Sequence, residues 1–258
     1  MSKTPKSPRG TEATVVVLPT YNEAENLPLI LPRVLEHGPE WHALVVDDDS
    51  PDGTGEVAQD WAERERRVEV LRRRGDKGLG RSYRDGLALA LERGYRYVFT
   101  MDSDLSHPSE ALPEMRRKAR EHGASLGSRY VRGGAAEGFG VRRKLNSYVA
   151  IGLTRLILGL RVRDATAGFR CFRRDVLAAI EPETLTAEGF SIMEELSWRV
   201  ERAGYRWVEH PIVFKPRELG QSKVTAKQVA DVLLMLTRLR FGGWSPTRRP
   251  TGTSRTAP

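Results

Sequence analysis

Asp102 and Asp104 are the residues whose type and spacing point most directly to chemistry. They are separated only by Ser103, and they follow residues 97–101, whose β-branched and aromatic side chains predict a strand. Alternate carboxylates after a strand can grip a hard divalent cation and leave its other coordination positions to phosphate oxygens. Such a cation would neutralise a diphosphate group. The same residues also fit a solvated Asx turn, so the motif alone leaves both interpretations open.

A second acidic cluster has four aspartates within residues 47–52, again directly after an expected strand. Adjacent carboxylates repel one another unless a cation or hydrogen-bond donors lie close by. We interpret this cluster as part of a site that recognises a base or a ribose. One of the four could instead cap the helix that follows, because residues 51–53 form a Pro-Asp-Gly turn.

Basic residues surround a glycine-rich loop at residues 133–140, with Arg129 before it and residues 142–144 after it. Guanidinium groups bind phosphate through paired hydrogen bonds, so this set predicts a phosphate-binding region. A second basic loop, which contains Arg217 and Lys223, follows another expected strand. Both basic sets also fit solvated surfaces, and the sequence leaves that alternative open.

The elements that must position these motifs alternate between strands and helices. The expected strands are residues 14–18, 43–46, 68–71, 97–101 and 207–214, and the expected helices are residues 25–36, 54–66, 82–93, 109–121, 142–158, 194–203 and 226–239. This order predicts an α/β fold with a mainly parallel, doubly wound central sheet. Ligands bind beyond the carboxyl ends of the strands in such sheets, which is where the acidic motifs fall.

The composition of the 258 residues narrows the classes of partner. The formal net charge of +8 favours anionic partners such as nucleotide phosphates or an acidic membrane surface. Nucleic acid is not expected, because aromatic residues make up only 7% and are not interleaved with the basic ones. Cys171 is the only cysteine, which excludes an intrachain disulfide and suits a reducing cytosolic compartment.

We expect one catalytic domain at residues 12–241 between disordered tails at residues 1–11 and 242–258, which are rich in Pro, Ser, Gly, Thr and basic residues. We find no signal-peptide pattern and no run of about 18 apolar residues, so any contact with a membrane is expected to be peripheral. Phosphate-loop, GxGxxG, zinc-spaced histidine and GxSxG patterns are absent, which argues against NTPases, dehydrogenases and the common hydrolases.

Several segments together resemble family 2 glycosyltransferases, and within them the dolichol-phosphate mannose synthase branch with its bacterial polyprenyl-phosphate relatives. The segments that carry the resemblance lie in matching order and spacing at residues 18–27, 45–54, 101–108, 127–131, 163–170, 189–190 and 217–223. The resemblance implies a GT-A (Rossmann-like) fold, Mg²⁺ or Mn²⁺ as cofactor, and inversion at the anomeric carbon. It also implies a location on the cytoplasmic face of the membrane, with a separate membrane-protein partner as a further expectation.

The resemblance favours transfer of mannose from GDP-mannose to a polyprenyl (dolichyl) monophosphate. A UDP-glucose-dependent polyprenyl-phosphate glucosyltransferase shares most of the pattern and stays open. A family 2 transferase that acts on a hydroxyl acceptor also stays open. That chemistry needs a carboxylate base, and Glu194 and Glu195 are its candidates.

The resemblance also assigns roles to individual residues. It places five in the nucleotide pocket: Pro19, Tyr21, Glu23, Val46 and Asp48. It places the metal on Asp102 and Asp104, with the Ser103 backbone beside the donor. The acceptor phosphate is expected on Arg129, Arg143 and Ser147, and the donor diphosphate under Arg217 and Lys223. Asp104, Arg129 and Arg143 are the expected catalytic residues.

Two segments depart from the family pattern, and one helix allows two interpretations. Ser106 stands where many relatives have a glutamine that can serve as a third metal ligand, a role that serine fills weakly or through water. Residues 189–193 read GFSIM where many relatives read GFxFQ, which bears on the acceptor side. Residues 148–160 are apolar with basic flanks, so this helix could lie in an anionic membrane interface or pack against the core.

Overall fold

The structure is a computed structural model that describes residues 10–75, 77–138, 140–215, 226–244 and 246. For residues 141–144 and 226–233 it describes the backbone alone. The first strand begins at Thr14 and the last helix ends at Phe241. The two predicted tails lie largely outside the described residues, so the predicted domain bounds stay a prediction.

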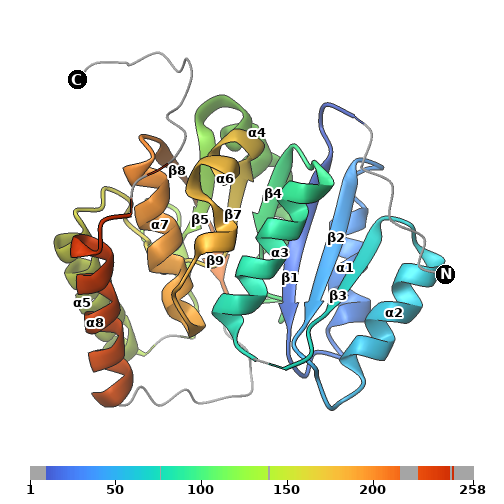
Figure 1. Ribbon diagram of the computed structural model, residues 1–258, viewed down its shortest axis with the longest axis horizontal. Coiled ribbons are helices and arrows are strands. Elements are labelled where there is room, and N and C mark those ends of the chain that lie inside the picture. Colours follow the sequence, from blue (N-terminus) through green and yellow to red (C-terminus); the bar gives the residue numbers. More distant parts are fainter. Residues whose placement is uncertain (1–9, 76, 139, 216–225, 245, 247–258) are drawn as a thin grey trace.

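A seven-stranded sheet in the order β3-β2-β1-β4-β7-β5-β8 forms the centre of the molecule (Figure 1). Its strands are β1 (Thr14–Thr20), β2 (Trp41–Asp47), β3 (Val68–Arg72), β4 (Tyr97–Thr100), β5 (Gly123–Ser128), β7 (Arg170–Arg173) and β8 (Arg206–Pro211). β7 runs antiparallel to both of its neighbours, and the other neighbouring pairs are parallel. A small parallel pair joins β6 (Ala135–Ala136) and β9 (Val213–Phe214). The predicted α/β fold with a mainly parallel sheet is confirmed.

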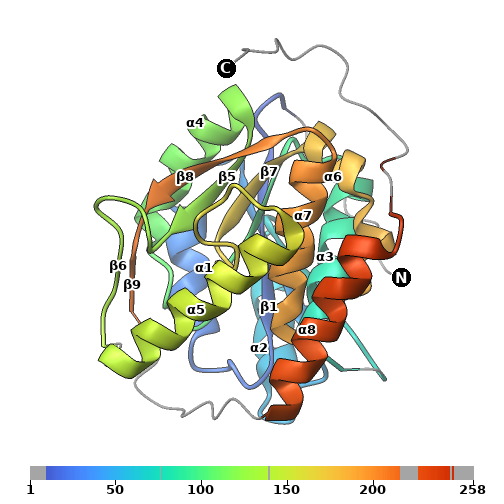
Figure 2. The ribbon, with the colours of Figure 1, turned by 90° about the vertical axis from the view of Figure 1, so that its left-hand side faces the viewer.

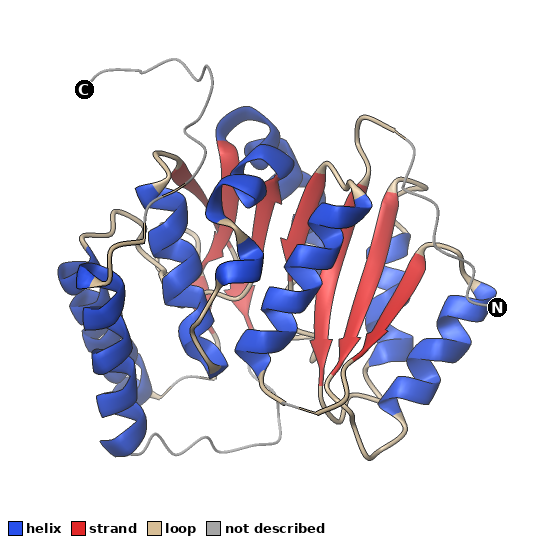
Figure 3. Cartoon of the chain, viewed as in Figure 1, coloured by secondary structure: helices blue, strands red, loops and turns tan. Residues whose placement is uncertain are grey.

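Helices cover both faces of this sheet (Figure 3). They are α1 (Leu27–Leu35), α2 (Thr54–Arg64), α3 (Leu79–Arg93), α4 (Leu112–His122), α5 (Val141–Leu158), α6 (Arg174–Ile180), α7 (Ile192–Arg202) and α8 (Ala226–Phe241), with short 3₁₀ turns η1 (Ser109–Ala111), η2 (Pro182–Thr184) and η3 (Gly189–Ser191). One core cluster joins the sheet to α3, α6 and α7, and a second joins it to α1, α2 and α4. Figure 2 shows α5 and α8 side by side at one end of the sheet.

β1 explains why the first strand is a continuous apolar run. Val15 and Val17 belong to one core cluster, whereas Val16 and Leu18 belong to the other, and all four are fully buried. A strand with helices on both faces cannot alternate apolar with polar side chains. β1 therefore lies deep in the sheet, and its carboxyl end lies where the predicted ligand site begins.

Three strands and one helix were not predicted, namely β5, β6, β7 and α6. β5 has the sequence GASLGS, whose small residues have weak strand propensity. β7 contains Arg170 and Arg173, and charged residues are unusual in a buried strand. Arg170 is nevertheless fully buried because it donates to the carbonyls of Ala165 and Ala167. These contacts come from tertiary structure, so a reading of local patterns missed the strands.

Within the described residues, no helix is long and apolar enough to cross a membrane.

α3 approaches the sheet closely at Gly86. A Cβ atom at this position would lie 2.6 Å from Cγ1 of Val17 and 2.9 Å from Cγ2 of Val46. Both distances are shorter than carbon–carbon contacts in a packed core, and both valines are fully buried in the sheet. The absence of a side chain at Gly86 therefore sets how near α3 lies to β1 and β2.

We expect Gly86→Ala to lower the free energy of unfolding by about 1–3 kcal/mol, because the new methyl group overpacks the space between helix and sheet. Gly152→Ala is the matched control, since a Cβ at Gly152 in α5 meets no atom within 4 Å. The control should be neutral or gain up to about 1 kcal/mol from helix propensity. Urea denaturation measures both variants, and a Gly86→Ala protein as stable as the wild type would contradict the packing argument.

Candidate functional site

The predicted acidic motifs meet at the carboxyl ends of β1, β2 and β4. The hydroxyl of Ser103 donates to the carbonyl of Pro19 over 3.0 Å, which joins the segment after β4 to the end of β1. The hydroxyl of Thr20 lies 3.4 Å from Oδ1 of Asp47, at the end of β2. The Asp102–Asp104 motif and the aspartate cluster therefore face one ligand site, as expected for a parallel sheet.

Two of the four clustered aspartates form hydrogen bonds within the loops after β1 and β2. Asp47 accepts a hydrogen bond of 2.6 Å from the hydroxyl of Ser50. Asp52 accepts from the backbone N–H groups of Thr54 and Ala24, over 3.0 and 3.2 Å. The N-cap residue of α2 is Gly53, so none of the four aspartates caps this helix. Asp52 instead fastens the loop after β1 to the start of α2.

Asp48 is neutralised by a neighbouring cation. Its carboxylate forms an ion pair with Arg73 and also accepts from the backbone N–H of Gly78 over 2.5 Å. Arg73 in turn binds Asp85 over 2.8 Å. These contacts tie the end of β2 to the segment that leads into α3. A ligand at this edge meets a compensated ion pair at Asp48 and not a lone carboxylate.

The other residues expected in the nucleotide pocket differ in exposure. Tyr21 is 51% exposed, and the Lys77 ammonium lies 5.4 Å from the centre of its ring. Glu23 is buried and accepts a hydrogen bond of 2.6 Å from the side chain of Asn26. The side chain of Val46 is fully buried in the core against α3, so it does not reach the surface of the site.

Asp102 is positioned by two aromatic residues that the sequence analysis did not single out. Its Oδ1 accepts a hydrogen bond of 2.9 Å from the hydroxyl of Tyr83, and its backbone N–H donates to Nδ1 of His107 over 3.2 Å. Burial, with the nearby Asp102 carboxylate, raises the pKa of Tyr83 well above its usual value, so the phenol stays protonated as the donor.

His107 is a buried, neutral neighbour of the same carboxylate. Its ring stacks on Phe169 with centroids 5.2 Å apart and meets the edge of Phe214 at 5.6 Å. Burial lowers the pKa of His107, and the nearby Asp102 and Asp104 carboxylates only partly oppose this effect. Because Nδ1 accepts from the Asp102 backbone, the proton resides on Nε2, which lies 3.9 Å from Oδ2 of Asp102.

The donor atoms around Asp102 and Asp104 fit a hard divalent cation. Both ligands would be carboxylate oxygens, which Mg²⁺ and Mn²⁺ prefer, and Oδ1 of Asp104 accepts from the Ser106 N–H over 3.1 Å. A Cβ on Gly168 would lie 3.4 Å from Oδ1 of Asp102, so the glycine keeps space beside that carboxylate. The buried Ser106 hydroxyl has no hydrogen-bond partner among the described residues.

Two carboxylates cannot complete the coordination of such an ion. In the part of the chain that the structure describes, no group of three or more His, Cys, Asp or Glu residues could hold a metal. The remaining ligands would therefore come from phosphate oxygens, water or a neutral oxygen such as the Ser106 hydroxyl. This is the arrangement expected of a site that binds a metal together with its substrate.

Two of the residues expected to bind the acceptor phosphate already bond to other side chains. Arg129 donates to Asp164 from Nε and Nη2 over 2.8 and 2.7 Å, and Nη2 also reaches Thr166. Burial opposes the charge of Arg129, but the hydrogen bonds and the charge of Asp164 outweigh it and raise the pKa of Arg129. Ser147 exchanges a hydrogen bond of 2.7 Å with the Tyr130 hydroxyl. The arginine expected to bind phosphate thus already has a carboxylate partner.

Three predicted site groups lie outside the described residues. They are Arg217, Lys223 and the side chain of Arg143. Their expected roles at the donor diphosphate and the acceptor phosphate therefore stay predictions.

The two candidate carboxylate bases have different environments. Glu195 accepts from the N–H groups of Thr186 and Ala187 and forms a 2.6 Å ion pair with Arg199, so both of its oxygens are engaged. Oε2 of buried Glu194 has no partner among the described residues. Burial raises the pKa of Glu194 to about 7, and the positive charge of Arg170 only partly opposes this shift. Glu195 thus has a structural role, whereas Glu194 keeps a buried oxygen without a partner among the described residues.

Sequence reasoning missed Tyr83, His107, Arg73 and Asp164 as parts of this site. His107 follows the aspartate pair by three residues, and that proximity is the one local signal among the four. Tyr83 lies in a predicted helix, 19 residues before the carboxylate that it contacts. Nothing in the helical pattern indicates that contact.

We expect Glu194 to make stability depend on pH. The folded pKa of about 7 lies above the ordinary value of 4.5, so the folded state holds this proton more tightly than the unfolded chain. The stabilising contribution is present below about pH 4.5 and is lost as the pH rises to about 7. Glu194→Gln lacks this titration, so its stability relative to wild type should rise over that window by an amount on the order of 3 kcal/mol.

Urea denaturation at about pH 5 and about pH 8 measures this effect. Glu110→Gln is the control, because Glu110 is an exposed carboxylate. Parallel stability profiles for wild type and Glu194→Gln would show that Glu194 is not a perturbed group.

This chain is similar to one family model and to proteins of known name. The family model described as glycosyl transferase family 2 matches residues 15–180. The chain is 42% identical to the polyprenol monophosphomannose synthase of Mycolicibacterium smegmatis, over 93% of this chain and 91% of that protein. It is 41% identical to the undecaprenyl-phosphate mannosyltransferase of Micrococcus luteus, over 87% of this chain and 92% of that one.

Solved structures agree on the fold. Glucosyl-3-phosphoglycerate synthase from Mycobacterium tuberculosis, in complex with Mn²⁺, UDP and glucosyl-3-phosphoglycerate, superimposes with a TM-score of 0.62. The match covers 90% of this chain and 80% of that chain at 15% identity, so it bears on the fold alone, which is the predicted GT-A fold. The family match and the two relatives confirm the resemblance seen in the sequence: this chain belongs to glycosyl transferase family 2 and is a glycosyltransferase.

Proposed function

We propose that this enzyme transfers mannose from GDP-mannose to the phosphate of a polyprenyl lipid, with inversion at the anomeric carbon, at a membrane surface. The observation that carries the proposal is the 42% identity, along 93% of the chain, to a protein named polyprenol monophosphomannose synthase. The second relative, an undecaprenyl-phosphate mannosyltransferase, supports the same sugar and the same class of acceptor.

The donor side supports a metal-dependent reaction. Asp102 and Asp104 would hold Mg²⁺ or Mn²⁺, and Tyr83 and His107 keep the Asp102 carboxylate in place for that purpose. When bound, the ion would neutralise charge on the diphosphate leaving group. The glucosyl-3-phosphoglycerate synthase, which was solved with Mn²⁺ and UDP, shares this fold and supports the same cofactor class.

The acceptor needs no strong base. A polyprenyl phosphate is already an anion at neutral pH, so catalysis must mainly position two anionic substrates and offset their charge. Arg129 and Ser147 both contact Tyr130, whose hydroxyl hydrogen-bonds Ser147 and whose ring centre lies 5.2 Å from the Arg129 guanidinium. Asp164 fixes the orientation of Arg129 from one side. The opposite edge of the guanidinium, at Nη1, is the part that would meet a phosphate.

A hydroxyl acceptor is the second candidate, and Glu194 is the observation that favours it. A base with a pKa near neutral pH suits deprotonation of a sugar hydroxyl. Under our proposal Glu194 takes no proton from the acceptor, so Glu194→Gln should retain turnover with polyprenyl phosphate. Loss of that turnover in a folded variant would favour the hydroxyl-acceptor reaction.

The direct test supplies radiolabelled GDP-mannose or UDP-glucose, a short polyprenyl phosphate and Mn²⁺ or Mg²⁺, and then counts label extracted into organic solvent. We expect EDTA-sensitive label from GDP-mannose. Label from UDP-glucose alone would keep the chemistry but change the sugar. Absence of lipid-soluble label from both donors, with protein shown to be folded, would overturn the proposal.

We expect Asp104→Asn to lower turnover in this assay on the order of 100-fold, because the loss of one carboxylate weakens the hold on the cation that offsets diphosphate charge. Asp60→Asn is the matched control, since Asp60 is an exposed carboxylate on α2, away from the site. A variant with wild-type turnover that remains EDTA-sensitive would remove Asp104 from the metal site.

α5 supports the membrane part of the proposal. Large apolar side chains at helical spacing are exposed along one side of it: Leu145, Tyr148, Val149, Leu153 and Leu156. Ile151, Thr154 and Leu158 on another side are buried. The helix thus packs on the core and also presents an apolar stripe, so the two interpretations left open by the sequence are compatible. We propose that this stripe enters the interface of an anionic bilayer, to which the +8 chain is attracted.

We expect Leu156→Asp to weaken binding to vesicles of phosphatidylglycerol by about tenfold, because an inserted leucine contributes roughly 1.5–3 kcal/mol. Leu29→Asp is the matched control, since Leu29 is also an exposed helical leucine but lies on α1. Vesicle flotation measures both variants. Equal binding of Leu156→Asp and wild type would exclude the α5 stripe as the membrane contact.

A further inference from the structure

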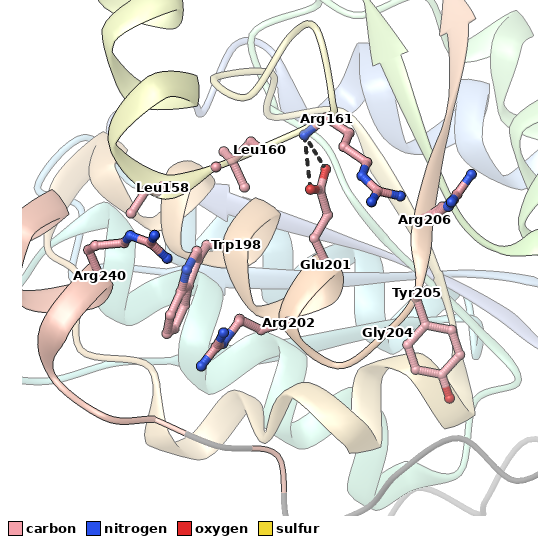
Figure 4. Close-up of a pocket in the computed structure, with 11 residues that line it drawn as sticks. Leu158, Leu160, Arg161, Trp198, Glu201, Arg202, Gly204, Tyr205, Arg206 and Arg240 are labelled. Carbon is pink, nitrogen blue, oxygen red and sulfur yellow. Dashed lines mark hydrogen bonds between the residues drawn. The ribbon is translucent and has the colours of Figure 1, made fainter. Parts of the chain in front are cut away.

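A cavity of about 550 Å³ lies outside the site described above. Its residues come from the ends of α5 and α7, the start of β8 and the end of α8 (Figure 4). The buried side chains of Leu158, Leu160, Trp198 and Tyr205 contribute apolar surface. Four arginines contribute positive charge: Arg161, Arg202, Arg206 and Arg240.

The arginines are not neutralised within the described residues. None of the four guanidinium groups has an ion-pair or hydrogen-bond partner in that part of the chain, although the Arg202 guanidinium lies 5.9 Å from the Trp198 ring. Elsewhere on the surface, exposed arginines such as Arg117 pair with glutamates. Four like charges around one cavity repel one another, so an anion between them would lower the free energy.

Two glutamates near the cavity accept hydrogen bonds from backbone N–H groups. Both carboxylate oxygens of Glu201 accept from the N–H of Arg161, Oε1 over 3.1 Å and Oε2 over 2.9 Å (Figure 4). Oε1 also accepts from the N–H of Val162 over 3.0 Å. Glu209 similarly accepts from the N–H groups of Arg163 and Asp164 over 3.1 and 3.2 Å. These carboxylates hold the segment that follows α5, so the arginine side chains remain available to a ligand.

The cavity is separate from the sugar-transfer site. It includes residues 204–206 at the amino end of β8, and β8 runs parallel to β5, which is antiparallel to β7. Because β7 is antiparallel to β4, β8 and β4 run in the same direction. The aspartate pair follows the carboxyl end of β4. The cavity therefore lies at the amino ends of these strands, and the aspartate pair lies at the opposite, carboxyl ends.

We propose that this cavity is a second anion site, which binds a phosphate ester whose organic part packs on Trp198 and Leu158. Arginine forks suit the planar pairs of oxygens on phosphate, and the apolar surface suits the carbon atoms next to the ester. Such an ester could be the headgroup of an anionic phospholipid or a small soluble phosphate. The proposal does not depend on the sugar-transfer chemistry, since none of the cavity residues belongs to that site.

The test follows the indole N–H signal of Trp198 in ¹H–¹⁵N NMR spectra of the full chain, assigned through Trp198→Phe. Inorganic phosphate and monomeric dihexanoyl phosphatidylglycerol are the probes, at constant ionic strength. Dihexanoyl phosphatidylcholine is the zwitterionic control. We expect a saturable shift of the Trp198 signal, and an affinity about tenfold weaker in Arg206→Gln/Arg240→Gln, because two charge-assisted contacts are lost.

Arg64→Gln/Arg66→Gln removes the same charge from exposed arginines near the end of α2 and should bind like wild type. A shift with phosphatidylglycerol alone would identify a lipid headgroup as the source, and a shift with inorganic phosphate would identify a soluble phosphate; either supports the site. An unmoved Trp198 signal with both probes would overturn the proposal. An equal response to phosphatidylcholine, or undiminished binding in Arg206→Gln/Arg240→Gln, would overturn it too.

Discussion

The buried ion pair between Arg129 and Asp164 is the interaction on which both sides of the site depend. Asp164 is fully buried, and it accepts the backbone N–H and two side-chain N–H groups of Arg129. A buried carboxylate that lost this partner would cost several kcal/mol. The pair fastens the end of β5 to the loop before β7, and that loop brings Gly168 beside Asp102. One contact therefore orients Arg129 and holds the loop whose Gly168 lies beside Asp102.

Charge compensation divides the aspartates of the catalytic edge into two classes. Asp48 is balanced by the cationic Arg73. Asp102 instead has a neutral phenol and a neutral imidazole as neighbours, which orient the carboxylate without cancelling its charge. Neutral hydrogen-bonding partners of this kind preserve an attraction for a cation, because they add no positive charge of their own. The edge is thus acidic at the place where a diphosphate and its metal would bind.

The basic residues near the amino end of β8 have a different set of neighbours. There Glu201 accepts hydrogen bonds from backbone N–H groups, and the guanidinium groups of Arg161, Arg206 and Arg240 form no ion pair among the described residues. α5 connects this region to the acceptor side, and its exposed stripe ends at Leu156, just before the cavity residue Leu158. Four arginines of this basic chain thus gather around a single cavity.

Local patterns in the sequence determined the α/β class, the first four strands and the position of Asp102 and Asp104 at a strand end. These features depend on runs of β-branched residues, on helical periodicity and on turn residues. Each of these patterns can be identified within a window of about ten residues. The pairing of Asp48 with Arg73, the approach of Tyr83 and His107 to Asp102, and the different environments of Glu194 and Glu195 came only from the tertiary structure. The physical reason is that charge state and orientation depend on burial and on partners from other elements. Arg129 and Asp164, for example, are 35 residues apart, and no local pattern in the chain connects them.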